Sequence, residues 1–268
     1  NEESYIRDSV RRLEEWGASG IDINMGCPVR KALQHNYGVA LMGDANYARD
    51  VVAMTVRNTK LPVSVKLRAG PQGDKQFLFD FVRGLEEEGA AWLCLHPRTA
   101  EQKRRGRADW SQISEVRSKI SIGLIGNGDV QTAEDAQRML LETGADMVMV
   151  GRALTARPWL LWQLGEQWGW PAPSGREGEF APRSPEEEGR EFGRALLRLV
   201  DFMEQYFQEP LGLRKLKFFV RTSGCWLMFG QQLYSLVSLA QTYEQARENI
   251  SRFFSQPQAM CAQTELRQ

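Results

Sequence analysis

The chain has 268 residues, of which 42% are apolar and 25% are charged, with zero formal net charge at pH 7. This composition is typical of a globular protein with one large domain and a smaller addition, and no apolar run is long enough to span a membrane. Four cysteines without paired spacing and only two histidines argue against a disulfide framework or a zinc site, so a reduced cytoplasmic protein is expected, with no signal peptide, no membrane association and no metal.

The first predicted element is a helix over 3–16, whose apolar residues fall on one face. Short strand-like apolar runs then alternate with helical segments as far as Trp159. Strands are expected at 21–25, 61–67, 91–96, 121–128 and 146–151, and helices at 45–58, 76–89, 110–119 and 131–143. Gly144 stands where a helix C-cap is usual. Repeated strand and helix units of about 30 residues predict a parallel sheet.

Two architectures fit this alternation, a doubly wound open sheet and a (β/α)8 TIM barrel. Polar residues stand at the carboxyl ends of all five strands, and in a barrel these ends surround one site. In an open sheet only the strand ends near the switch point share a ligand. The pattern therefore favours the barrel, and no G-x-G-x-x-G motif supports a dinucleotide site. The strand-end residues are Asn24 and Cys27, Lys66 and Arg68, His96 and Arg98, Asn127 and Asp129, and Gly151 and Arg152.

Five strands are fewer than a barrel needs. We therefore expect an incomplete barrel over 1–160, in a chain that lacks about the first three strand and helix units of its parent. Residues 168–190 are rich in Pro, Gly and charge, and a linker is predicted over 161–190. A helical domain is expected over 191–256 and a frayed tail over 257–268.

Within the helical domain, Ser184 is a suitable N-cap for its first helix, with Pro185 at the first position. Further helices are predicted over 212–229, from near Leu233 and from Thr242, where Thr242 and Gln245 resemble a capping box.

Cys27 follows a strand and a glycine, on the side where a barrel has its site. Such a thiol acts as a nucleophile or as a proton donor. The alternative is a buried structural cysteine, an interpretation that suits Cys94 better than Cys27. A nucleophile needs a base, and His96 is the histidine at a strand end, so a Cys–His pair stays open. Lys66, Arg68 and Arg98 either bind a ligand or are solvated strand-end charges.

Glycine-containing loops after the last two strands indicate a phosphate-bearing ligand, since late barrel strands commonly form such a site. Two basic segments point to a larger anion. Loop 98–107 carries Lys103, Arg104 and Arg105, and the helix around 213–221 carries Arg214, Lys215 and Lys217. Each segment alone also suits a solvated loop or an amphipathic helix, whereas two together favour a polyanion.

The ordered segments IDINMGCPVRK, PVSVKLRAG, LHPRT, IGNGDV and ADMVMVGRAL resemble the tRNA-dihydrouridine synthases over about 21–160. The later segments RKLKFFVR and TYEQARENISRFF are similar to the tRNA-binding C-terminal domain of that family, in a bacterial branch. The resemblance implies reduction of a uridine C5=C6 bond in tRNA, with FMN as cofactor and NADPH as reductant. Cys27 then matches the proton donor of the family.

The resemblance also implies the roles of the remaining candidates. The cofactor-binding set is Lys66, His96, Asn127, Gly128, Asp129, Gly151 and Arg152. The substrate-binding set is Asn24, Arg68, Arg98, Lys103, Arg104, Arg105, Arg214, Lys215 and Lys217.

The chain departs from the family where a first strand with an Ala-Pro-Met motif and a later glutamine to the flavin are expected. We therefore expect weak FMN binding and little activity from this chain alone, and a monomer. The alternatives are another FMN-dependent barrel dehydrogenase acting on a free pyrimidine, and a catalytically silent RNA-binding fragment.

Overall fold

The computed structural model describes residues 2–103 and 105–264. The chain forms two compact units, which are described separately. Unit 1 comprises Asn1–Val130 and Glu134–Val150, and unit 2 comprises Gln131–Ala133 and Gly151–Gln268. The change of unit therefore falls at Gly151, before the boundary expected at residue 160. None of the helices in the described ranges is both long and apolar enough to cross a membrane.

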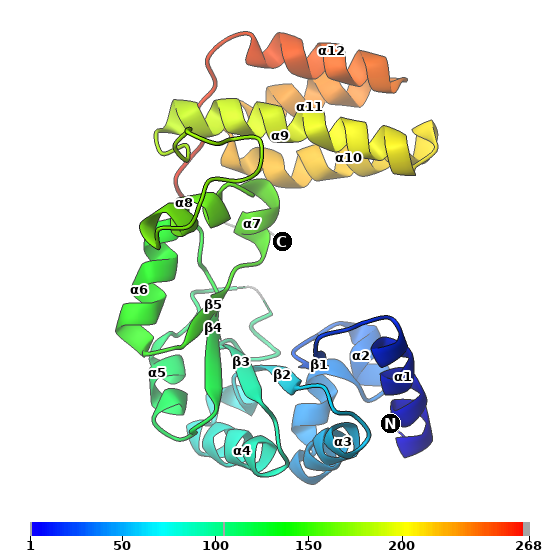
Figure 1. Ribbon diagram of the computed structural model, residues 1–268, viewed down its shortest axis with the longest axis vertical. Coiled ribbons are helices and arrows are strands. Elements are labelled where there is room, and N and C mark those ends of the chain that lie inside the picture. The colour runs from blue at the N-terminus through cyan, green and yellow to red at the C-terminus, as the bar shows by residue number, and fades with distance from the viewer. Residues whose placement is uncertain (1, 104, 265–268) are drawn as a thin grey trace. The chain divides into compact units, whose positions relative to one another are not determined.

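Unit 1 contains a five-stranded parallel sheet (Figure 1). Its strands are β1 (Ile21–Met25), β2 (Val63–Arg68), β3 (Trp92–His96), β4 (Gly123–Asn127) and β5 (Met147–Met149). The spatial order is β1-β2-β3-β4-β5, the same as the order along the chain. A doubly wound sheet reverses its strand order at a switch point, and no such reversal occurs among these strands. The sheet is part of a (β/α)8 barrel, as the sequence predicts.

Helices follow the strands and lie along one side of the sheet (Figure 1). They are α1 (Glu3–Glu15), α2 (Arg30–Gln34), α3 (Ala45–Arg57), α4 (Lys75–Glu87), α5 (Ser111–Arg117) and α6 (Ala133–Thr143). Asp44 and Asp74 cap α3 and α4 by accepting the N–H of Tyr47 and Phe77. The five strands and the longer helices are confirmed within a few residues. Helix α2 and the short 3-10 segments Gly38–Gly43 and Pro71–Gly73 were not predicted.

The two faces of the sheet differ in chemistry, because side chains alternate along each strand. The face toward the helices is apolar and buried, as Val65, Leu67 and Leu93 show with no measurable exposure. The opposite face carries Asp22, Asn24, Ser64, Lys66, Cys94, His96 and Asn127 by the strand register. This polar face is where the candidate site lies.

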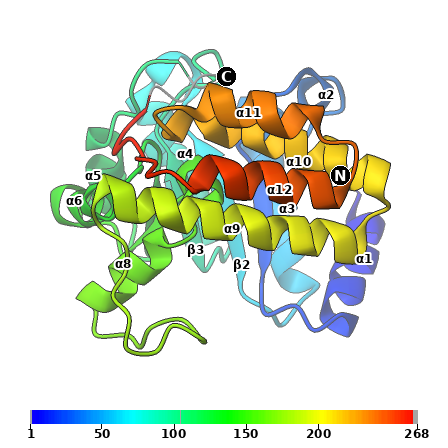
Figure 2. The ribbon, with the colours of Figure 1, turned by 90° about the horizontal axis from the view of Figure 1, so that it is seen from above.

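Unit 2 begins with α7 (Arg152–Ala156) and α8 (Leu160–Gln167). Four longer helices then form a bundle: α9 (Pro185–Tyr206), α10 (Glu209–Ser223), α11 (Gly230–Leu239) and α12 (Tyr243–Phe254). A short 3-10 turn, Gly224–Trp226, precedes α11. Helix α12 packs against α9 and α11, and α10 packs against the same two helices (Figure 2).

Both residues predicted to cap helices of the bundle, Ser184 and Thr242, do so. Ser184 forms a full capping box with Glu187, which begins α9 at Pro185 as expected. Thr242 caps α12 by accepting the N–H of Gln245. The Gln245 side chain, however, accepts the N–H of Gln241 rather than that of the cap residue, so the box is incomplete.

The predicted linker over 161–190 is partly helical, since α8 occupies its start and α9 its end. The irregular stretch between them is held by charged side chains. Arg176 makes two bonds to Glu191, at 2.7 and 3.0 Å, and its guanidinium lies over the Trp162 ring, 4.7 Å from the centroid. Polar composition identified the lack of regular structure, but these contacts hold the stretch against the unit.

The prediction of a frayed tail over 257–268 is wrong for the part that the structure describes. Met260 is 2% exposed, pairs with Leu227 in an antiparallel bridge, and donates its N–H to Pro185 O at 2.9 Å. Cys261 donates to Trp226 O at 2.8 Å. The buried side chain of Met260 and the paired backbone groups hold this segment against the bundle. The polar residues around Met260 gave no sign of this in the sequence.

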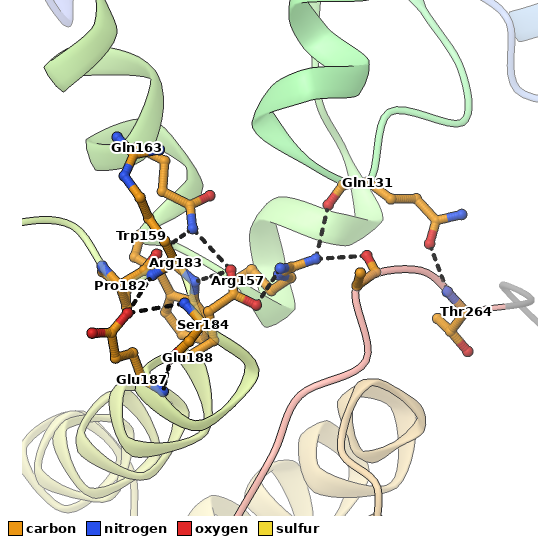
Figure 3. Close-up of polar contacts among 11 residues, drawn as sticks. Gln131, Arg157, Trp159, Gln163, Pro182, Arg183, Ser184, Glu187, Glu188 and Thr264 are labelled. Atoms are coloured by element: carbon orange, nitrogen blue, oxygen red, sulfur yellow. Dashed lines mark hydrogen bonds and ion pairs between the residues drawn. The ribbon is translucent and has the colours of Figure 1, made fainter.

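A buried ion pair joins four segments of unit 2 (Figure 3). Arg157 pairs with Glu188, and the two side chains are 4% and 5% exposed. Trp159 and Gln163 also donate to the Glu188 carboxylate, at 3.1 and 2.8 Å. The Arg157 guanidinium further donates to Gln131 O and Ala262 O, at 3.2 and 2.9 Å. Residues far apart in sequence are thus tied to one charged centre.

Candidate functional site

Strand register brings several predicted residues together on the polar face of unit 1. Asn24 of β1 stands opposite Lys66 of β2, which stands opposite Cys94 of β3. One step further toward the carboxyl ends, Arg68 stands opposite His96. The carboxyl ends of β1 to β3 therefore place an amide, two cations and an imidazole in two adjacent rows of neighbouring positions.

Lys66 lies half-buried on this face. Its ammonium donates to Asn127 Oδ1 at 3.1 Å, and the Asn127 amide nitrogen donates to Met149 O at 2.8 Å. The second bond orients the amide so that its oxygen meets the lysine. Burial lowers the pKa of Lys66, with Arg68 lowering it further, while Cys94 and Asp22 raise it. A cation in this setting has more to gain from an anionic or electron-rich ligand than one in open water.

His96 is held as a neutral imidazole. Burial lowers its pKa to about 3, assisted by the nearby charges of Arg68, Lys66 and Arg98. Arg98 Nη1 lies 3.1 Å from His96 Nε2. Because a guanidinium can only donate, Nε2 accepts and the ring proton sits on Nδ1. Nε2 thus already accepts a hydrogen bond from Arg98, and the ring is a weak base. Both facts argue against a catalytic pair of Cys27 and His96, which the sequence left open.

Arg98 is 2% exposed and binds Asp129, with Nη2 at 2.8 and 2.7 Å from the two carboxylate oxygens. Asp129 also accepts the N–H of Ala108 at 2.7 Å, and its φ of 57° lies in the left-handed region. The preceding Gly128 has a φ of 122°, and a Cβ there would lie 2.8 Å from Ala108 Cβ. This turn needs glycine, and Asp129 ties it to the loop after β3 by its ion pair with Arg98 and by its bond from the Ala108 N–H.

Arg68 is also buried, at 6% exposure, and its guanidinium binds backbone carbonyls. Nε donates to Gly26 O at 2.7 Å, and Nη1 donates to Thr99 O and Lys103 O at 3.1 and 2.8 Å. Arg68 and Arg98 thus hold loops in this structure, and their role toward a substrate stays a prediction. The sequence alone does not distinguish a strand-end arginine that binds a ligand from one that binds a neighbouring loop.

Cys27 lies half-buried just beyond β1 on a loop with a fixed backbone. Asn24 Oδ1 accepts the N–H of Gly26 at 2.9 Å, and Cys27 O accepts the N–H of Val39 at 3.1 Å. Gly38 has a φ of 61°, and a Cβ there would lie 2.8 Å from Cys27 O. The thiol is therefore carried on a rigid turn. Cys94, in contrast, is 1% exposed, and burial raises its pKa to about 11.

The other predicted residues are distributed as follows. Lys103 and Arg105 are exposed on the loop after β3, and Arg104 lies outside the described residues. In unit 2, Gly151 is the N-cap of α7 and Arg152 is its first residue. On α10, Arg214 is exposed, the Lys215 ammonium lies over the Phe207 ring, 5.0 Å from the centroid, and Lys217 donates to Ala240 O at 2.8 Å. Lys217 thus caps the carboxyl end of α11.

The polar face of unit 1 carries groups that suit an anionic or electron-rich ligand. Lys66 offers a cation, His96 a neutral ring and Asn127 an amide, with the apolar Met149 beside them. The donor set fits the pyrimidine end of an FMN ring, which gains negative charge on reduction. No cluster of three or more His, Cys, Asp or Glu side chains in the described ranges could hold a metal ion.

Three residues that the sequence reasoning passed over also shape the site. Gly38 allows the backbone to approach Cys27, and Trp110 donates Nε1–H to Gly128 O at 3.0 Å. Asp22 accepts from Ser64 Oγ at 2.7 Å on the polar face. A carboxylate inside a predicted strand was the signal for Asp22 in the sequence, whereas the other two residues depend on contacts with residues farther along the chain.

The family model described as "Dihydrouridine synthase (Dus)" matches residues 1–216. A protein of Rhizobium leguminosarum bv. phaseoli named "Probable tRNA-dihydrouridine synthase" is 41% identical over 158 residues, which are 59% of this chain and 50% of that protein. A protein of the same printed name from Mycobacterium leprae is 35% identical, covering 87% of this chain and 59% of that protein. The "tRNA-dihydrouridine synthase B" of Pseudomonas aeruginosa is 29% identical, covering 79% and 60% respectively. The chain thus spans about half to three fifths of the length of these relatives.

Proposed function

Since the chain belongs to the dihydrouridine synthase family, we propose that it carries the central catalytic part of a tRNA-dihydrouridine synthase. The reaction is reduction of the C5=C6 bond of a uridine in tRNA. The observation that carries this proposal is the polar face of a family-matched half barrel, where Lys66 meets Asn127 at 3.1 Å. The proposed setting is the cytoplasm, where tRNA is modified, and the proposed state is a monomer.

FMN is the proposed cofactor, which supplies hydride to C6 of the uridine when it is bound and reduced, with NADPH as the reductant. Lys66 and His96 hold its ring in this proposal. The ammonium of Lys66 balances negative charge at the pyrimidine end. Neutral His96 contributes a polar edge without adding a second full charge beside that ammonium. The residues proposed for its phosphate loops are Asn127 and Gly128 in unit 1 and Gly151 and Arg152 in unit 2, as the family resemblance implies, whereas Asp129 binds Arg98.

Cys27 is the proposed proton donor to C5. A neutral thiol can release its proton there, and the thiolate that forms regains a proton from water. His96 accepts from Arg98 at Nε2, which favours this acid role over a Cys–His nucleophile. The hydrogen-bonded turn around Gly26 and Gly38 supports this proposal by fixing the backbone that carries the thiol, and a uridine base would have to leave its stack to reach it.

The tRNA itself is proposed to lie against exposed cations. On unit 1 these are Lys103 and Arg105 of the basic loop, and on unit 2 Arg214 and Lys215 of α10. Neutralised phosphates release counterions, so this binding should weaken steeply with salt. Asn24 is the proposed contact to the uridine.

The test measures three quantities on the purified chain: FMN binding by quenching of flavin fluorescence, NADPH oxidation, and dihydrouridine in tRNA by mass spectrometry. Cys27→Ala should abolish the low dihydrouridine formation expected of this chain, while its weak FMN binding is kept. The matched thiol control is Cys225→Ala, because Cys225 is exposed and lies in unit 2. Reduction of free uridine in preference to tRNA would contradict the proposal, as would dihydrouridine formation by Cys27→Ala.

A further inference from the structure

Asp22 is the one carboxylate in the five strands β1 to β5, all of which lie in the described residues. It belongs to β1, where it stands opposite Ser64 of β2. Ser64 is 3% exposed and donates its Oγ–H to Asp22 Oδ1 at 2.7 Å. The bond shows that Asp22 faces the same side of the sheet as Ser64, and it fixes where the carboxylate lies.

Lys66 is two residues beyond Ser64 and therefore faces the same side. Asp22 and Lys66 are diagonal neighbours on adjacent strands, a relation in which side chains of opposite charge attract. The charged and titratable groups of the neighbouring strands on this face are Asp22 of β1, Arg68 of β2, and Cys94 and His96 of β3, with neutral Asn127 on β4. Asp22 is the single anion among them while Cys94 remains a thiol.

We propose that Asp22 is a positioning residue for Lys66, supplying the fixed negative charge that keeps the lysine protonated beside the cofactor. Asn127 directs the ammonium from one side, and the carboxylate held by Ser64 balances it from the other. The lysine needs this support because burial and the Arg68 charge both favour its neutral form. The role toward FMN rests on the proposed function, whereas the charge coupling is a property of the chain itself.

The test uses the full chain without cofactor. Its lysines are reductively methylated with ¹³C, and the pKa of each is read from the pH dependence of its NMR signal. The Lys66 signal is the one that disappears in Lys66→Arg. Removing the charge by Asp22→Asn should lower the pKa of Lys66 by about 0.5 to 1 unit at low salt. Asp22→Glu keeps the charge and should restore most of that shift.

Two controls separate charge from general disturbance. Ser64→Ala removes the hydrogen bond but keeps the carboxylate, so its shift should be smaller. Asp80→Asn removes an equal charge from α4, where the aspartate is exposed and bonds Gln76, and should leave Lys66 unchanged. Far-UV circular dichroism checks folding, and Asp22→Ser serves as the second neutral variant if Asp22→Asn does not fold.

A Lys66 pKa that stays within about 0.2 unit in a folded neutral variant overturns the proposal, because Asp22 then only bonds Ser64. FMN binding is measured separately by fluorescence quenching. If the Lys66 pKa shifts as expected but no variant binds FMN, the charge coupling stands and the proposed function fails. If FMN binds but the pKa of Lys66 does not shift, the charge coupling fails and the proposed function is not contradicted.

Discussion

Arg98 donates to Nε2 of His96 across 3.1 Å, and this contact fixes which ring nitrogen carries the proton. The neutral imidazole has a consequence for stability. Because burial lowers the pKa of His96 from 6.5 to about 3, the unfolded chain binds a proton between these values that the folded chain does not. Stability should therefore fall as the pH is lowered through this window, by at most about 1.4 kcal/mol per pH unit from this group.

Urea unfolding from pH 7 to pH 4 measures this slope. His96→Gln should remove the part that His96 contributes, while His35→Gln, at the exposed second histidine, should keep it. A slope that survives His96→Gln unchanged would assign the pH dependence to the carboxylates instead. Imidazole ¹⁵N chemical shifts should also report the Nδ1–H tautomer down to pH 5.

Asp129→Asn should destabilise unit 1 by about 3 kcal/mol, because it leaves the buried Arg98 guanidinium without its anion. Asparagine tolerates the left-handed backbone at this position, so the change isolates the charge. Chemical denaturation followed by tryptophan fluorescence measures it, and Asp80→Asn is the exposed control. Equal stability of the two variants would mean that Arg98 does not depend on Asp129.

Gly38→Ala should strain the turn that carries Cys27. An added Cβ would lie 2.8 Å from Cys27 O, at a φ of 61° that alanine disfavours. A loss of about 1 to 3 kcal/mol is expected, together with a changed rate of Cys27 alkylation by iodoacetamide. Gly43→Ala is the matched control, since a Cβ there meets no atom within 4 Å. An unchanged alkylation rate in Gly38→Ala would show that the turn does not govern access to the thiol.

Glu188→Gln should be among the most damaging single changes in unit 2. It leaves Arg157, which is 3% exposed, without its carboxylate partner in the buried cluster of Figure 3. Breaking a buried pair by removing one member costs about 3 to 5 kcal/mol. Thermal unfolding measures the loss, and the exposed Glu186→Gln, in the same helical turn, should be nearly neutral. A mild effect at Glu188 would mean that water or a rearranged side chain compensates Arg157.

Met260→Ala tests whether the segment after α12 is an integral part of the bundle. Its side chain is 2% exposed, so truncation should cost about 2 to 4 kcal/mol. Met228→Ala, at a methionine that is 63% exposed on the neighbouring segment, should cost little. Amide hydrogen exchange at Met260 and Cys261 gives a second readout, because a frayed tail would exchange without protection.

The sequence predicted the barrel strands well because each is a short apolar run bounded by glycine or polar residues. Its polar strand ends predicted Lys66 and His96 as candidates, and the register places these two in adjacent rows of one face. It could not separate these from Arg68 and Arg98, which are equally polar and stand at the same strand ends. The difference lies in carbonyls of a loop some 30 residues away in sequence, which accept from Arg68 at 3.1 and 2.8 Å.

The sequence by itself thus determined local features. These are the strand and helix periods, the Ser184 cap, the family motifs and the thiol after Gly26. These depend on residues within a few positions of one another, and short-range sterics and burial encode them. Tertiary structure alone decided which charges are buried and paired, the tautomer of His96, the anchored segment around Met260 and the face that Asp22 shares with Lys66. Those outcomes depend on strand register and on partners distant along the chain, which no local pattern specifies.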